Sequence, residues 1–177
     1  MKLLAFGAST SSTSINRQLA VYAAGLVEGA QVTDLDLSRY SLPLYSSDEE
    51  SASGPPPDAQ AFLNAIRSHD GVVVSLAEHN SSYAAAFKNL YDWSSRIDAK
   101  VWGGKPMLLL AASPGGRGGA SVLAAAEATF PRMGAVLAGT FRLPKFHDNF
   151  TPAGIQDASL QAALNKAVAA FQAALSS

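Results

Sequence analysis

The sequence predicts an α/β fold in which helices cover both faces of a five-stranded parallel sheet. Short apolar runs, typical of buried strands, alternate along the chain with longer segments whose apolar residues recur every three or four positions, as in helices. The chain has 177 residues, which is the size of one ordinary domain, and it contains no internal repeat. We therefore expect a single domain over residues 1–177.

The first half of the chain predicts two strands, two helices and a long loop. Lys2–Gly7 and the weaker run Val32–Leu37 predict strands, and apolar residues at helical spacing predict a helix over residues 14–28 between them. Because Ser41–Pro57 holds four prolines and a cluster of acidic residues, we expect no helix there but a surface loop that is a lid, an interface arm or a linker. Asp58 is the expected N-cap of the next helix.

The second half predicts three more strands, each followed by a helix. Val72–Leu76 is rich in β-branched residues and nearly all apolar, as expected of a strand buried on both faces at the centre of a parallel sheet. The remaining elements, in chain order, are a helix over residues 87–97, a strand over Pro106–Ala112, a helix over Ala120–Phe130, a strand over Val136–Thr140 and a closing helix over Leu160–Leu175.

Composition excludes several classes of protein. The chain has no cysteine, which excludes disulfides, thiol nucleophiles, iron–sulfur clusters and thiolate zinc sites. Its 13 basic and 14 acidic side chains lack the positive excess with which proteins bind nucleic acid, and no apolar stretch is long enough to cross a bilayer. We therefore expect a cytoplasmic protein with no nucleic-acid or membrane partner. His69, His79 and His147 lack the spacing of metal ligands, so we expect no metal site.

Function is expected in the loops after the first, third and fourth strands, because doubly wound sheets bind ligands outside the carboxyl ends of their strands. The first of these loops carries six hydroxyls between Ser9 and Ser14 and leads into a helix. Such a tract favours a phosphate group, although a single hydroxyl would also serve only to cap the helix. The loop lacks the glycine and lysine pattern of a nucleoside triphosphate site and the glycine spacing of a dinucleotide site.

The second and third loops carry different signals. In the second, Glu78, His79 and Asn80 would suit a hydrolase with His79 as the base, but no serine there is flanked by the glycines of a nucleophile elbow. The third has four glycines between Gly115 and Gly119, where one or two would be enough for a tight turn. We interpret the excess as a sign that the backbone closely approaches a ligand.

Three segments match the motifs of a known family. Ser9, Ser14 and Asn16 fit the serine and asparagine positions of its first loop, and Ser113–Gly119 fits its glycine-rich third loop. With these motifs the chain, from Met1 to about Thr140, resembles the NADPH-dependent FMN reductase family of flavodoxin-like proteins, which includes bacterial quinone and chromate reductases and some azoreductases. The family's second loop and following helix are matched by Glu78, Asn80, Lys88, Asn89, Asp92 and Trp93.

Three positions depart from the family pattern. Ser11 stands where an arginine is common, which removes a charge-assisted contact to a phosphate. Ala77 and His79 replace a proline and a tyrosine, and this changes the rim beside the flavin ring that the resemblance implies. The residues do not discriminate among electron acceptors or between NADPH and NADH.

The resemblance implies a flavodoxin-like three-layer sandwich and an NAD(P)H-dependent FMN oxidoreductase. Hydride would pass from NADPH through bound FMN to a small acceptor, such as a quinone or a flavin, by a ping-pong mechanism in one shared site. Because the cofactor supplies the redox chemistry, no catalytic side chain is expected, although His79 is a candidate proton donor to a quinone. The residues expected to bind the cofactor are Ser9, Ser11, Ser14, Ile15, Asn16, Ala77, Glu78, His79, Asn80, Ser81, Ser113, Pro114, Gly115 and Gly116.

The resemblance also implies a homodimer or homotetramer that assembles through the helix carrying Phe87, Tyr91 and Trp93. Two alternative functions stay open on the residues alone. One is a non-enzymatic, flavodoxin-like FMN-binding electron carrier, although carriers tend to present a strongly charged face and the net charge here is −1. The other is an ester hydrolase that uses a serine of the first loop with His79 or His147.

Overall fold

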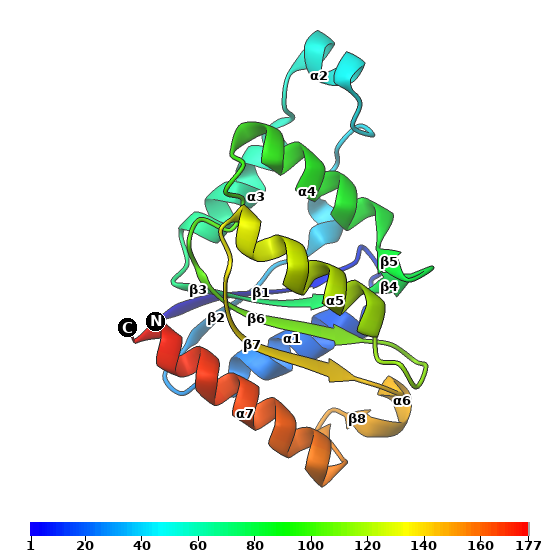
Figure 1. Ribbon diagram of the computed structural model, residues 1–177, viewed down its shortest axis with the longest axis vertical. Helices are drawn as coiled ribbons and strands as arrows, with labels where there is room; N and C mark the ends of the chain where they lie inside the picture. The colour runs from blue at the N-terminus through cyan, green and yellow to red at the C-terminus, as the bar shows by residue number, and fades with distance from the viewer. Residues whose placement is uncertain (177) are drawn as a thin grey trace.

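In the computed structural model, which describes residues 1–176, five parallel strands form one sheet in the order β2-β1-β3-β6-β7 (Figure 1). The chain places β2 beside β1 and then crosses to the other side of β1 to add β3, β6 and β7 in turn. The order therefore reverses between β1 and β3, which is where doubly wound sheets bind ligands. The strands are β1 (Lys2–Ala8), β2 (Gln31–Asp34), β3 (Gly71–Leu76), β6 (Pro106–Ala112) and β7 (Val136–Leu143).

Helices cover both faces of this sheet, which confirms the predicted three-layer sandwich (Figure 1). On one face lie α1 (Ile15–Gly25) and α7 (Ala158–Leu175), and their apolar side chains form one buried core with the strands. On the other face α3 (Pro57–Arg67), α4 (Ala85–Ile97) and α5 (Ala120–Thr129) form a second core. Burial of these two apolar surfaces is the main stabilising contribution to such a fold.

The central strand β3 behaves as its sequence predicts. Every residue of Gly71–Leu76 is buried, because helices cover the strand on both faces. Val72, Val74 and Leu76 point into the core beneath α3, α4 and α5, while Val73 points into the core beneath α1 and α7. The polar side chain of Ser75 also faces α1, so it needs a hydrogen-bond partner there.

The prediction that no helix forms within 41–57 is wrong, because Ser47–Ser53 forms α2. The side chain of Ser46 accepts a hydrogen bond from the backbone N–H of Glu49, and three acidic residues in the first turn favour the positive end of the helix dipole. Gly54, with φ of 69°, ends the helix. The acidic cluster that the composition attributes to a loop is therefore the first turn of a capped helix.

The short helix α2 projects from one end of the molecule, beyond α4 (Figure 1). None of its residues is buried, and Glu50 ties it to the body through an ion pair in which the Arg96 Nε lies 2.9 Å from a carboxylate oxygen. Nearby, the rings of Tyr45 and Trp93 meet edge to face with centroids 5.0 Å apart. The segment is thus an arm attached to α4.

The helix α3 begins differently from its prediction. Pro56 is its N-cap residue and Pro57 occupies the first turn, where a proline loses no hydrogen bond. The side chain of Asp58 does not cap the helix; it accepts a hydrogen bond from the backbone N–H of Ser41, with 2.7 Å between the atoms. The predicted N-cap role of Asp58 is therefore wrong, and this carboxylate instead anchors the start of the arm.

Other differences concern element ends and short elements. The first helix ends at Gly25, β2 is shorter than its prediction and β7 is longer. Within residues 1–176, no helix combines the length and the apolar character that a membrane span requires. The sequence does not predict the short elements, which are η1 (Leu37–Arg39), β4 (Glu78–His79), β5 (Ser82–Tyr83), η2 (Phe130–Met133), α6 (Phe146–Asn149), β8 (Phe150–Thr151) and β9 (Gly154–Ile155).

Candidate functional site

The three loops that the sequence singles out meet at the carboxyl edge of the sheet. Together they line a cavity of about 220 Å³ between the ends of β1, β3 and β6. Among the sequence-predicted residues, Asn80, Ser81, Gly115 and Gly116 do not line this cavity. Its lining comprises Ser9, Ser11, Thr13, Ser14, Ile15, Asn16, Ala77, Glu78, His79, Ala112, Ser113 and Pro114.

Thr13 and Ala112 also line the cavity, and the sequence prediction does not include them. Thr13 belongs to the same hydroxyl tract as Ser9 and Ser14, so the tract itself was the available signal. Ala112 is the last residue of β6, and its place in the lining follows from strand register, which the sequence pattern does not fix.

The first loop offers several hydrogen-bond donors to an anion. Ser14 caps α1 by accepting a hydrogen bond from the backbone N–H of Arg17, and Ser9 Oγ accepts one from the N–H of Ser11. Both hydroxyl protons are therefore available to donate outward. Within residues 1–176, the backbone N–H groups of Ile15 and Asn16 have no acceptor, as expected for the first turn of a helix. This arrangement suits a phosphate group.

Gly7 allows the first loop to lie against α1. A Cβ atom built at this position would lie 2.3 Å from the backbone nitrogen of Arg17 and 2.8 Å from its Cα. Real Cβ atoms do not come so close to other backbone atoms, so only glycine permits this approach. The first turn of α1 is thereby held directly against the end of β1.

The side chain of Asn16 binds the protein itself. It is 3% exposed, and its Oδ1 accepts hydrogen bonds from the Ser75 hydroxyl at 2.7 Å and from the Ala112 N–H at 2.8 Å. Its Nδ2 donates to the carbonyl oxygen of Ala112 at 3.1 Å. Asn16 therefore joins α1 to the ends of β3 and β6: its side-chain oxygen and one of its amide protons are bonded within the protein, while its backbone N–H is free for a ligand.

The second loop is a β-hairpin made of β4 and β5. Its two turn residues, Asn80 and Ser81, have φ of 51° and 62°, as in the type I′ turns that favour asparagine. Glu78 Oε2 accepts a hydrogen bond from the backbone N–H of Val122 in the first turn of α5, with 2.9 Å between the atoms. Glu78 thus fixes the hairpin to α5, and His79 stands exposed at the cavity rim.

The four glycines of the third loop divide into two pairs. Gly118 and Gly119 have positive φ of 60° and 76°, and a Cβ at either would lie within 3.0 Å of Pro144 or Ala111. These two are required by the turn and by packing. Gly115 and Gly116 have no positive φ and nothing closer than 4.0 Å to a built Cβ, so neither backbone conformation nor packing requires a glycine at these two positions.

The third loop is held by the segment that follows β7. The N–H of Ser113 donates to the carbonyl of Leu143, and the N–H of Lys145 donates to the carbonyl of Gly115 at 2.9 Å. In return, the N–H of Phe146 donates to the carbonyl of Ser113. These backbone bonds fix the loop in place, so the cavity wall on this side is preformed.

A family model described as NADPH-dependent FMN reductase matches residues 1–148 of the chain. The chain belongs to this family. One relative within it is the NAD(P)H-dependent FMN reductase PA1204 of Pseudomonas aeruginosa, which is 36% identical over 116 residues, covering 65% of this chain and 61% of that protein. Another is a quinone reductase of Escherichia coli, 39% identical over 79 residues, covering 45% of this chain and 42% of that protein. The matched segments thus span less than two thirds of these relatives.

Solved structures of this type have the same fold. FerB, a flavoenzyme NAD(P)H:(acceptor) oxidoreductase from Paracoccus denitrificans, superposes with a TM-score of 0.77 at 24% identity, over 99% of this chain and 97% of that one. A flavodoxin mutant from Pseudomonas aeruginosa superposes with a TM-score of 0.56 at 18% identity. These likenesses confirm the flavodoxin-like fold predicted from the sequence.

The polar groups of this cavity suit the phosphate of the flavin that names the family. Hydroxyls and unpaired N–H groups gather at its α1 end, while the second and third loops form its other walls. The lining contains no lysine or arginine, so neutral donors would hold a phosphate there. Ser11, at the position where the family commonly has arginine, is exposed, and its N–H is bonded to Ser9.

A second, larger cavity lies on the other side of the first loop. It has a volume of about 790 Å³ and meets the smaller one only at Thr13, Ser14 and Ile15. Neither the hairpin nor the glycine loop contributes to it. It is therefore a separate groove that shares one wall with the candidate flavin site.

Proposed function

We propose that this protein is an NAD(P)H-dependent FMN reductase that passes electrons to a small acceptor such as a quinone. The observation that carries the proposal is the convergence of the hydroxyl loop, the hairpin and the glycine loop on one cavity at the carboxyl edge of the sheet. The family match and the names of the relatives support the same activity.

Different parts of the site would bind the phosphate and the ring of FMN. Ser9, Ser14 and the free N–H groups of Ile15 and Asn16 would hold the FMN phosphate, and Ser11 lies beside them. The flavin ring would lie between the segments Ala77–Ser81 and Ser113–Gly116. FMN, when bound, accepts a hydride from a nicotinamide and returns two electrons to an acceptor. The protein fixes its position, since the walls on both sides are held by hydrogen bonds.

A single opening at this site would have to serve both substrates. The cavity is small, at about 220 Å³, and the hairpin and glycine loop enclose it on two sides. The nicotinamide must therefore leave before the acceptor enters, and this order predicts ping-pong kinetics. His79 is exposed at the rim, where its imidazole can give a proton to a reduced quinone.

The test of this function is steady-state oxidation of NADPH by the FMN-loaded protein with a soluble benzoquinone. We expect acceptor-dependent oxidation, with parallel lines in double-reciprocal plots when both substrates are varied. The His79→Gln variant is expected to lower quinone turnover between pH 6 and 8, because a glutamine amide cannot give a proton to the reduced quinone.

Other outcomes separate the alternatives. FMN binding without nicotinamide oxidation would favour the electron carrier, and ester hydrolysis without flavin binding would favour the hydrolase. Intersecting lines would contradict a shared site. If His79→Gln turns over quinone as the wild type does across this pH range, His79 is not the proton donor.

We also propose self-association into a dimer or tetramer, but through other side chains than those suggested by the sequence. Phe87, Tyr91 and Trp93 are between 0% and 8% exposed in the single chain and belong to its own core or pack against the arm. These three side chains are therefore not free to contact a second copy, and association through this helix, which stays a prediction, would use its other residues. Among the large apolar side chains exposed within residues 1–176, Leu44 on the arm beside α4 is the most exposed, at 83%, and is a candidate contact for a second copy.

A further inference from the structure

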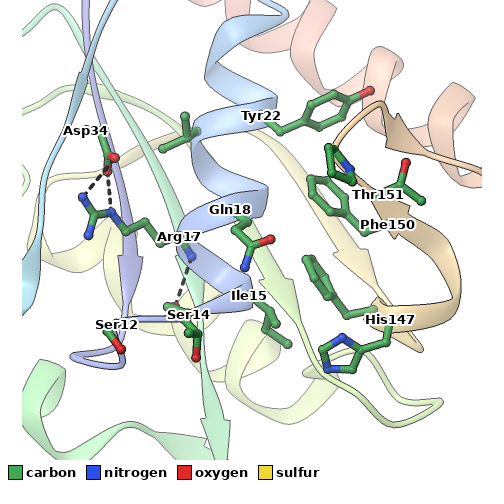
Figure 2. A pocket seen from close by; sticks show the side chains of 14 residues that line it. Ser12, Ser14, Ile15, Arg17, Gln18, Tyr22, Asp34, His147, Phe150 and Thr151 are labelled. Atoms are coloured by element: carbon green, nitrogen blue, oxygen red, sulfur yellow. Dashed lines mark hydrogen bonds and ion pairs between the residues drawn. The ribbon is translucent and has the colours of Figure 1, made fainter.

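The groove of about 790 Å³ lies along the N-terminal half of α1 (Figure 2). On one side of the helix it reaches Arg17 and Asp34, at the end of β2. On the other side it reaches the segment from Phe146 to Pro152, which includes α6 and β8. The hydroxyl loop forms its end, so a ligand phosphate on that loop would lie beside both cavities.

One side of the groove is an aromatic wall. The rings of Phe146 and Phe150 stack with centroids 4.8 Å apart, and the rings of Tyr22 and Phe150 meet edge to face with centroids 5.4 Å apart. Tyr22 is held in place by the hydrogen bond from its hydroxyl to Gln161 Oε1, at 2.7 Å. Phe150 and Tyr22 are only partly buried, so they present apolar ring surface to the groove. A wall of this kind favours a flat aromatic ligand.

Unpartnered polar side chains accompany this wall. Within residues 1–176, the amide of Gln18 and the imidazole of His147 have no hydrogen-bond or ionic partner, and both are exposed. Figure 2 shows Gln18 between the Arg17–Asp34 pair and the aromatic side chains. An amide offers one acceptor and two donors, which is the combination that recognises the edge of a purine.

The far side of the groove carries carboxylates. Arg17 binds Asp34 through two hydrogen bonds, at 2.8 and 3.0 Å, and its Nη1 lies 3.0 Å from a carboxylate oxygen of Asp36. The hydrogen bond to Asp34 is the main reason why the pKa of Arg17 is raised. One guanidinium against two carboxylates leaves an excess of negative charge, which repels an anion. The carboxylate oxygens can still accept hydrogen bonds from hydroxyls. A carboxylate at the end of the second strand holds the ribose hydroxyls in dinucleotide-binding folds.

We propose that this groove binds the adenylate half of a dinucleotide whose other phosphate lies on the loop from Ser9 to Asn16. The base would lie against Phe150 and Gln18, the ribose would face Asp34, and Ser12 and Thr13 would meet the second phosphate. This inference rests on the proposed FMN site, because FAD is FMN extended at its phosphate by adenylate. The protein then accepts FAD as well as FMN.

The test is a pair of fluorescence titrations of the apoprotein, one with FMN and one with FAD, on the wild type and two variants. We expect the wild type to bind FAD at least as tightly as FMN. Phe150→Ala is expected to lower the affinity for FAD about tenfold, which is the effect of losing one base–aromatic stacking contact. Gln18→Ala, on the exposed face of α1, is expected to lower the affinity for FAD about threefold, which is the effect of losing one hydrogen bond.

Both variants should bind FMN within a factor of two of the wild type. Gln60→Ala, on α3 and outside the groove lining, is the matched control and should leave both affinities unchanged. The proposal is overturned if the wild type binds FAD a hundredfold more weakly than FMN and neither variant changes the binding of the nicotinamide cofactor. Equal losses of FMN and FAD affinity in the variants would also overturn it, since they would indicate a structural role.

A second arm distinguishes the source of the adenylate. If the FMN-loaded variants bind NADH more weakly than the wild type while FAD affinity is low, the groove takes its adenylate from the nicotinamide cofactor, and the placement of the other phosphate on the loop from Ser9 to Asn16 is overturned. Binding of neither flavin would instead contradict the proposed function itself. If the protein binds FMN but the two substitutions change neither FAD affinity nor NADH affinity, the proposed FMN site stands and the groove is not an adenylate site.

Discussion

Asn16→Ala is expected to lower the free energy of unfolding by about 3–5 kcal/mol, the largest loss of stability we expect from a side chain at the site. The substitution leaves the Ala112 N–H and C=O and the Ser75 hydroxyl without their partner in a buried place. An unsatisfied buried donor or acceptor costs about 1–3 kcal/mol. Urea denaturation followed by circular dichroism measures this loss.

A matched control is Asn165→Ala on the exposed face of α7, where the amide only accepts a hydrogen bond from Gln161. We expect a change of at most about 0.5 kcal/mol there. An Asn16→Ala loss below about 1 kcal/mol would show that the link between α1, β3 and β6 is not needed to hold the site edge together. The same result would leave Asn16 free for the ligand role that its motif position implies.

Gly7→Ala is expected to reduce FMN affinity by more than about a hundredfold, because the added methyl group would overlap the backbone of Arg17. The clash can be relieved only if the first turn of α1 moves away from β1. That movement displaces Ser14 and the free N–H groups of Ile15 and Asn16, each of which would donate a charge-assisted hydrogen bond to the phosphate in the proposed site. Flavin fluorescence titration measures the loss, and overpacking should also cost about 1–3 kcal/mol of stability.

Gly25→Ala is the control for this substitution, since it changes a glycine at the other end of the same helix. No atom lies within 4 Å of a Cβ built there, so the expected effect is unchanged FMN affinity and a stability gain of up to about 1 kcal/mol. If Gly7→Ala binds FMN as the wild type does, the close contact between β1 and α1 does not position the loop.

Four of the five strands could be predicted because each is a short, mainly apolar run bounded by polar or turn residues, whereas β2 is polar and mostly exposed and gives a weaker signal. Val72–Leu76 is the clearest case, since burial on both faces requires an almost wholly apolar strand. The helix α2 could not be predicted from composition, because prolines and acidic residues occur both in loops and at helix ends. The capping pattern from Ser46 to Glu49 was the informative signal.

The meeting of the three loops could also be predicted, because parallel strands place all their carboxyl ends at one edge. The direction of individual side chains could not. Asn16 points inward to Ala112 and Ser75, and Glu78 points toward α5, because each forms hydrogen bonds with residues distant in sequence. The groove along α1 depends on the placement of Phe150, which lies more than 120 residues further along the chain than α1.

The most direct test of the account is a comparison of FMN and riboflavin binding to the wild-type apoprotein, followed by flavin fluorescence. The central claim is that the loop from Ser9 to Asn16 holds the flavin by its phosphate. It predicts saturable binding of one FMN per chain, with riboflavin weaker by roughly a hundredfold or more, since at least two hydrogen bonds to a charged group are lost. Equal affinities for FMN and riboflavin, or no saturable binding of FMN, would contradict the claim.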